Sequence, residues 1–212
     1  MSPLSITAAD IEEMEHLYRI NLINSITGYK SANLIGTKSK NGVSNVAVFS
    51  SVTHFGSNPA LIGVVMRPTT VARNTYDNII NTKYYTINHI HQAIIEDAHH
   101  TSAKYPENIS EFDKTDLEEE YINNFEAPFV KQSVIKMAME LVETIPVKAN
   151  GTILVLGRVL ELILPPEIIA DDGFVDLNTA QTVAISGLDA YHRPQQQARL
   201  SYARPDQKVT KI

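Results

Sequence analysis

The alternation of short strand-like segments with tight turns constrains the fold of this chain more than any other feature of its sequence. Three of these turns are marked by Asn41-Gly42, Asn58-Pro59 and Asn150-Gly151. Asn-Gly suits turn positions that need a positive φ, and Asn-Pro interrupts a strand. Since no regular strand–helix–strand alternation is visible, the sheet is predicted to be mainly antiparallel. Closing such a sheet into a barrel is the usual way to remove its unpaired edges.

The predicted elements make up one α+β domain, mainly β, that spans residues 1–212. A helix is predicted at about residues 8–25, because Thr7 and Asp10 resemble a capping pair and apolar residues follow at helical spacing. A second helix is predicted at residues 73–81. The strand-like segments are residues 31–37, 43–53, 60–66, 84–88, 134–147 and 152–164.

Two further segments are polar. Residues 91–128 are acidic and too poor in apolar side chains to own a core, so they are predicted to cover one end of the sheet as a helical excursion. Its two short helices are expected around residues 94–103 and 115–125. Residues 193–212 form a polar tail with five Lys or Arg residues and one Asp. That charge asymmetry suggests docking across a dimer, and ordinary disorder of a chain end is the competing interpretation.

Composition excludes several classes of function. The chain has 212 residues, a net charge of −6 and no cysteine, so disulfide, thiolate and Cys-ligated metal chemistry are excluded. An acidic protein lacks the basic face that a general nucleic-acid binder needs. No apolar run approaches the roughly 20 residues that span a membrane, and the first residues do not resemble a secretory signal. Cytoplasmic location is therefore the default expectation.

The segment from Ser44 to Asn88 concentrates the polar groups that could hold one flat, anionic cofactor. A strand with small hydroxyl side chains is followed by a second strand, an Arg-Pro-Thr-Thr turn and a helix that opens with Arg-Asn-Thr. A phosphate favours Arg and hydroxyl donors at a helix start, where backbone N–H groups are free. Here these donors are Arg67, Thr70, Arg73 and Thr75. Short polar side chains for the ring come from Asn45, Ser50, Ser51 and Thr53.

The order and spacing of these motifs resemble the flavin reductase-like, FMN-binding split-barrel family. Residues 45–60 align without gaps to the family's pattern Asn-Ala-Ala-Pro-Tyr-Ser-Phe-Phe-Asn ending in Asp-Pro-Pro, with matches at Asn45, Ala47, Ser50 and Pro59. Residues 73–79 align to Lys-Asp-Thr-x-x-Asn-Ile, with Arg and Asn in the first two places. Later matches are Asn150-Gly151-Thr152, Gly157-Arg158-Val159, Asp172-Gly173 and residues 187–191. The resemblance covers about residues 26–191.

The resemblance implies an antiparallel Greek-key split barrel with peripheral helices, which binds FMN at the interface of a homodimer. It also implies hydride transfer from NAD(P)H to N5 of the flavin, and onward transfer of electrons to a small-molecule or protein acceptor. FMN could be a resident group or an exchanging substrate. The cofactor-binding residues implied by the resemblance are Asn45, Val46, Ala47, Ser50, Ser51, Val52, Thr53, Arg67, Thr70, Arg73, Asn74, Thr75 and Tyr191.

Each assignment has a structural alternative. Ser50 and Ser51 could satisfy backbone groups at a bend, and the two Arg residues could be solvated surface charges. His192 is a candidate proton donor or acceptor near the flavin, or a histidine in a surface turn. His89 and His91 lie on one face of a strand, but two ligands are too few for a metal site, so none is expected. Two other functions stay open: a non-enzymatic flavin electron carrier, and a barrel like pyridoxamine-phosphate oxidase.

Overall fold

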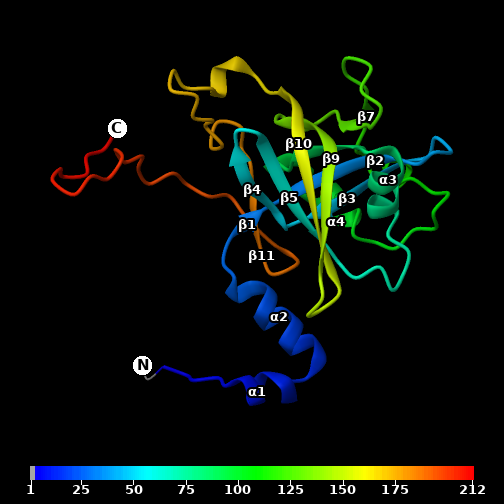
Figure 1. Ribbon diagram of the computed structural model, residues 1–212, viewed down its shortest axis with the longest axis horizontal. Helices are drawn as coiled ribbons and strands as arrows, with labels where there is room; N and C mark the ends of the chain where they lie inside the picture. The colour runs from blue at the N-terminus through cyan, green and yellow to red at the C-terminus, as the bar shows by residue number, and fades with distance from the viewer. Residues whose placement is uncertain (1–2) are drawn as a thin grey trace.

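The body of the molecule is a seven-stranded antiparallel sheet in the order β3-β2-β6-β9-β10-β5-β4 (Figure 1). The structure is a computed structural model that describes residues 3–212. The strands of this sheet are β2 (Asn33–Lys38), β3 (Ser44–Phe49), β4 (Val52–Ser57), β5 (Ala60–Met66), β6 (Tyr84–His89), β9 (Lys136–Val147) and β10 (Thr152–Ile163). The antiparallel prediction and the predicted barrel class are therefore confirmed.

The two edges of this sheet meet at one corner. β3 and β4 are the edge strands, yet only Ser50 and Ser51 separate them in the chain. The sheet must therefore curl until its edges come together at this bend. Among residues 3–212 no ladder joins β3 to β4, so the barrel is closed at this corner and split elsewhere. The prediction of one strand over residues 43–53 is wrong, because the bend separates two strands that pair with different neighbours.

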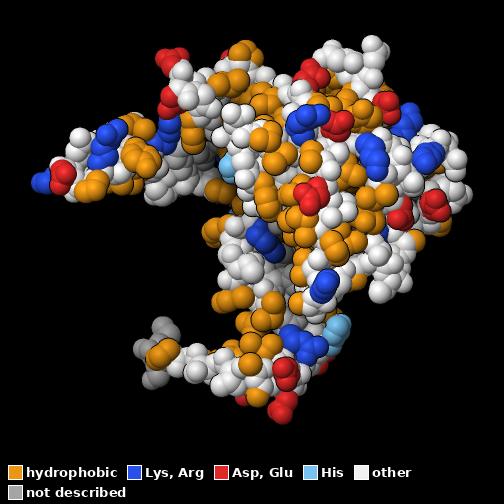
Figure 2. Space-filling model, in the orientation of Figure 1, with side chains coloured by type: hydrophobic (Ala, Val, Ile, Leu, Met, Phe, Trp, Pro, Cys, Tyr) orange, Lys and Arg blue, Asp and Glu red, His pale blue; other side chains and the backbone are white. Residues whose placement is uncertain are grey.

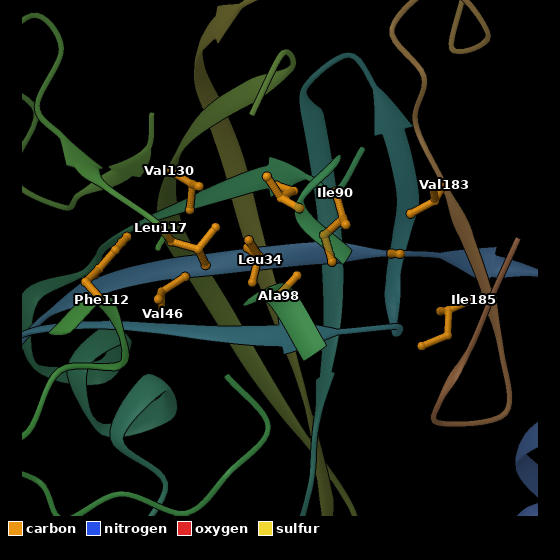
Figure 3. Close-up of a cluster of buried hydrophobic side chains, with 11 residues drawn as sticks. Leu34, Val46, Ile90, Ala98, Phe112, Leu117, Val130, Val183 and Ile185 are labelled. Carbon is orange, nitrogen blue, oxygen red and sulfur yellow. The ribbon is translucent and has the colours of Figure 1, made fainter. Parts of the chain in front are cut away.

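Both faces of the central strands are buried. Ile35 of β2 packs with Ile79 and Tyr85 in one core cluster. Leu34, the next residue along the strand, packs with Val46 and other residues in a second cluster (Figure 3). Alternate residues of a strand point to opposite faces, so the first cluster fills the barrel and the second lies under the excursion.

The excursion and the last part of the chain cover the outer face. A second, three-stranded sheet has the order β1-β11-β12. Helix α3 (Asn74–Thr82) lies between β5 and β6 in the chain. The remaining elements are β1 (Lys30–Ser31), η1 (Gln92–Ile94), α4 (Ile95–His100), η2 (Glu111–Lys114), β7 (Glu119–Glu120), β8 (Phe129–Val130), η3 (Pro166–Ile168), β11 (Ala184–Ser186) and β12 (Ala190–His192).

The predicted helix at residues 115–125 is wrong. β7 pairs there with β8, and both Asn123 and Asn124 have a positive φ, 50° and 58°. A helix cannot contain such residues, because the left-handed region interrupts its hydrogen-bond ladder. The acidic side chains thus border a loop and a short hairpin.

The predicted N-terminal helix is two helices, α1 (Ala8–Glu13) and α2 (His16–Ile26). The capping box of Thr7 and Asp10 is confirmed at the start of α1. Met14 has extended backbone, and the Glu15 carboxylate accepts a hydrogen bond from Tyr18 N at 2.9 Å, which starts α2 afresh. Neither helix buries a single residue, and both project from the body (Figure 1). None of the helices described is long and apolar enough to cross a membrane.

Candidate functional site

The N-terminus of α3 has no side-chain cap. Arg73 occupies the capping position, and its side chain makes no hydrogen bond to the free N–H groups of the first turn. The side chains that usually cap a helix are Ser, Thr, Asp and Asn, which accept these hydrogen bonds. The unsatisfied N–H groups and the helix dipole together favour an anion at this place.

Two arginines, Arg67 and Arg73, lie at the two ends of the loop that leads from β5 into this helix. Arg67 directly follows β5 and is exposed, whereas Arg73 is half-buried and its Nε donates to Pro68 O at 3.3 Å. Within residues 3–212 neither arginine forms an ion pair. The hydroxyl of Thr70 is exposed on the loop between them. The first turn of α3 carries one acid, Asp77, whose carboxylate accepts a hydrogen bond from Arg73 N at 3.4 Å and, in the described structure, pairs with neither guanidinium group.

Buried amide and hydroxyl side chains fix α3 against the sheet. Asn45 Nδ2 donates to Thr75 Oγ1 at 3.1 Å, and both side chains are buried. One turn further on, Asn78 Nδ2 donates to Thr37 Oγ1 at 3.1 Å. The sequence predicted Asn45 and Thr75 as ligands. The structure brings them together as partners of each other, so they position the helix start.

The bend between β3 and β4 carries the other predicted residues. Ser51 Oγ donates to Val65 O at 2.9 Å, and Ser31 Oγ donates to Val52 O at 3.0 Å. The hydroxyl proton of Ser51 is thus used in a hydrogen bond to the backbone, as the structural alternative for this residue predicted. Within the described chain, the hydroxyls of Ser50 and Thr53 make no such bond, and Thr53 is exposed. These two are the groups at the bend that are free to meet a ligand.

Val46, another predicted cofactor-binding residue, does not lie at the bend. Its side chain is fully buried in the core under the excursion, and its N–H donates to Glu111 Oε2 at 3.1 Å. Ala47, the next residue, is only half-buried. Glu111 was missed by sequence reasoning, since nothing in an acidic stretch distinguishes one buried carboxylate. It pairs with a backbone donor of the edge strand β3 and thereby prevents that donor from being left unsatisfied.

We predict that Glu111→Gln makes the chain at least as stable at about pH 7, whereas Glu111→Ala costs about 1–3 kcal/mol by orphaning the N–H of Val46. Burial raises the pKa of Glu111 above its ordinary 4.5. The folded chain then binds this proton more tightly than the unfolded chain, so the free energy of unfolding falls as pH rises through the raised pKa. Urea unfolding between about pH 4 and 7 should show a smaller fall for Glu111→Gln. An unchanged pH slope would contradict this account.

Tyr191 and His192 lie on the neighbouring three-stranded sheet. His192 Nε2 is 2.8 Å from Ser186 Oγ, and the ring packs edge-on against Tyr29. The Tyr191 hydroxyl lies 3.3 Å from His99 Nδ1, and burial raises the pKa of Tyr191 to about 12. The link to the bend is indirect, because Ser31 of β1 bonds to Val52 O. The structure therefore connects these two residues to the bend through β11 and β1.

Of the remaining histidine pair, His91 has hydrogen-bond partners, whereas the buried Nδ1 of His89 has none among residues 3–212. His91 Nε2 lies 2.9 Å from Gln132 O, and its Nδ1 accepts from Ala93 N. Burial lowers the pKa of His89 to about 4, so this ring stays neutral. Residues 3–212 contain no group of three or more His, Asp or Glu side chains placed to hold a metal ion.

Comparison with known proteins agrees with this geometry. Residues 29–179 match the family described as "Flavin reductase like domain". This chain belongs to that family. A proposed flavin reductase with a split-barrel domain from Shewanella frigidimarina NCIMB 400 is 44% identical, with a TM-score of 0.92 over 95% of this chain and 100% of that one.

More distant matches extend the comparison. Nitrilotriacetate monooxygenase component B from Bacillus cereus shares the fold, with 21% identity and a TM-score of 0.82 over 94% of this chain and 100% of that one. An uncharacterised protein of Aquifex aeolicus (strain VF5) is 27% identical over 115 residues, 53% of this chain. The match spans only 59% of that relative's length. The split-barrel fold and the flavin reductase-like family are thus established for this chain.

Proposed function

We propose that this chain is an FMN-binding oxidoreductase, a flavin reductase that takes electrons from NAD(P)H and passes them to an acceptor. The observation that carries the proposal is the start of α3, which has no side-chain cap and follows a loop with two arginines that form no ion pair among residues 3–212. The free hydroxyls of the bend add further donors. A dianionic phosphate ester on a flat ring matches this set of donors.

The residues divide into two roles. Arg67, Arg73 and the first N–H groups of α3 would hold the phosphate, with Thr70 as a further donor. Ser50 and Thr53 would orient the rim of the ring along the bend, while Asn45 and Thr75 hold the helix start in place. Bound flavin supplies hydride acceptance at N5 and the onward transfer of electrons. This division explains why the chain needs no strong nucleophile or acid–base pair of its own.

We further propose that the working unit is a homodimer. On a single chain the candidate site is an open surface, since Thr53, Arg67 and Thr70 are all exposed. The hollow beside the start of α3 has a volume of about 60 Å³, which is too small for a three-ring cofactor. A second copy would exclude water from one face of the ring and leave the other free for a transiently stacked nicotinamide.

One absorbance experiment tests the proposal. The purified chain with added FMN should show the flavin bands between roughly 350 and 500 nm, shifted and quenched in fluorescence relative to free FMN. Anaerobic addition of NADH or NADPH should bleach these bands faster than in a mixture without protein. A spectrum identical to that of free FMN would refute FMN binding. Binding without bleaching would favour the electron-carrier alternative.

A further inference from the structure

The surface of this chain is far larger than a compact protein of its mass requires. The described structure exposes 13270 Å², whereas a folded monomer of 23.5 kDa is expected to expose about 9,800 Å². The excess is several times the ~800 Å² that each partner buries in an interface of ordinary size. The chain as folded therefore offers enough surface for an extensive interface.

The two chain ends contribute to this excess, because most of their residues are exposed. We call them the N-terminal arm (residues 3–29) and the C-terminal arm (residues 193–212). Helices α1 and α2 bury no residue, and isolated helices of 6 and 11 residues are marginal in water. The C-terminal arm folds back on itself, with Leu200 bridged to Lys211. A lone two-stranded hairpin is likewise marginal. The large apolar side chains exposed on the arms include Leu4, Leu17, Tyr18, Ile26, Tyr29, Leu200, Tyr202 and Ile212.

The C-terminal arm is tied down at its base. Arg199 pairs with Asp172 and lies 4.1 Å above the ring of Phe174. Its direction is thus fixed by the body, which disfavours the interpretation of a loose chain end. The Shewanella structure superposes on 95% of this chain, so most residues of the two arms, taken together, are matched in a second protein.

We propose that the two arms clasp a second copy of this chain. Both arms leave the body on the same side, next to β4 and β1, and enclose a broad hollow (Figures 1 and 2). In a two-fold dimer each copy supplies the same two arms to the other, so the exposed apolar side chains of all four arms are covered at once. A copy seated in the hollow would also cover the open side of the bend. This inference rests on the proposed dimer and names the segments that build it.

Charge favours the same partner. Residues 1–192 contain 13 Lys or Arg and 23 Asp or Glu residues, a net charge of −10, whereas the C-terminal arm contains five cations and one acid, a net charge of +4. Two such acidic bodies repel each other. A basic arm laid over the partner offsets that repulsion and adds attraction.

A photo-crosslink tests where the arm lies. Benzoylphenylalanine replaces Tyr202, which is 87% exposed on the single chain, in the full-length protein without flavin. Irradiation should give a covalent species of twice the mass of the chain. The matched control carries the same probe at Tyr121, which is 44% exposed in the loop after β7, on the side away from the arms (Figure 1). No dimeric product from position 202, or equal yields from both positions, would overturn the proposal.

Sedimentation equilibrium gives a second readout. Leu200→Glu with Tyr202→Glu should raise the dissociation constant of the dimer at least tenfold, while Tyr121→Glu should leave it unchanged. Unaltered association of the double variant would contradict the proposal. Flavin binding is measured separately, so the two hypotheses fail independently. Dimeric crosslinks in a protein that does not bind FMN would refute the proposed cofactor and support the proposed role of the arms. FMN binding without any dimeric crosslink would support the proposed cofactor and refute the proposed role of the arms.

Discussion

Replacing Arg67 and Arg73 together with alanine should weaken FMN binding roughly 100-fold or more, with almost no change in the unfolding free energy of the apo chain. Each charge-assisted hydrogen bond to a phosphate contributes about 1.5–3 kcal/mol, and about 1.4 kcal/mol is a factor of ten in affinity. Neither arginine forms an ion pair in the described structure, so removing them costs the apo fold little. Fluorescence titration with FMN and urea unfolding without it measure the two effects.

Lys40→Ala is the matched control. Lys40 is an exposed cation at the turn between β2 and β3, beside the other end of α3, where it borders a hollow with Asn81 and Thr82. Its loss changes the charge of the chain but should leave FMN affinity within about twofold, because a surface charge at that distance is screened. A similar loss of FMN affinity in Lys40→Ala would show that the arginines act only through the overall charge of the chain and do not contact the phosphate. A loss of apo stability in the double variant would assign the arginines a structural role.

Thr75 shows how the structure sharpens a sequence-based hypothesis. The sequence alone makes Thr75 a candidate phosphate ligand, since it opens a helix. The structure buries it against Asn45, so Thr75→Ala should lower both FMN affinity and apo stability. Thr75 and Arg73 are both candidate ligands at this helix start, yet they call for different experiments, for a reason that only tertiary packing reveals.

The sequence predicted the sheet well because hairpin turns and alternating burial are local signals. It failed at residues 43–53, where continuous β propensity conceals a change of partner: β3 pairs with β2, and β4 pairs with β5. Which neighbour a strand joins is decided by long-range pairing, so no pattern within the segment could place the bend. The sequence singled out Ser50 and Ser51 as polar residues, but it did not show that they separate β3 from β4.

The helix predictions for the N-terminal and acidic segments differ from the structure for another reason: the pattern of apolar or charged residues conceals the contact that decides the structure. Helix α2 begins anew at Glu15 because a carboxylate caps it, a signal that competes with an apolar spacing that continues through the break. The charged run around β7 favoured a helix, yet two residues with positive φ and a partner strand fixed another structure. Glu111, which holds the N–H of Val46, could not be distinguished from its acidic neighbours. The cap of α2 is a local contact that the apolar spacing conceals. The partner strand of β7 and the partner of Glu111 lie outside the segments that carry the pattern.

Gly157→Ala should destabilise the apo chain by about 3 kcal/mol, because the new methyl group would overpack the barrel core. A Cβ at this position would lie 2.0 Å from the hydroxyl of Tyr85, whose ring is fully buried and cannot swing away. That hydroxyl has no hydrogen-bond partner among residues 3–212, and burial raises the pKa of Tyr85 above its ordinary value. Tyr85→Phe alone should therefore leave stability unchanged or raise it slightly. This close approach gives the glycine of the Gly157-Arg158-Val159 motif a physical reason.

The double variant decides whether the contact is the cause. If the methyl group clashes with the hydroxyl, Gly157→Ala with Tyr85→Phe should recover at least about 1 kcal/mol relative to the sum of the single changes. Gly63→Ala is the control, since its Cβ would lie 2.4 Å from the ring of Phe55. Phe55 is 48% exposed and can rotate into solvent, so the cost there should stay below about 1 kcal/mol. Additive effects in urea unfolding would show that Tyr85 does not set the requirement for glycine. Equal costs at the two glycines would show that burial of the facing ring does not decide the outcome.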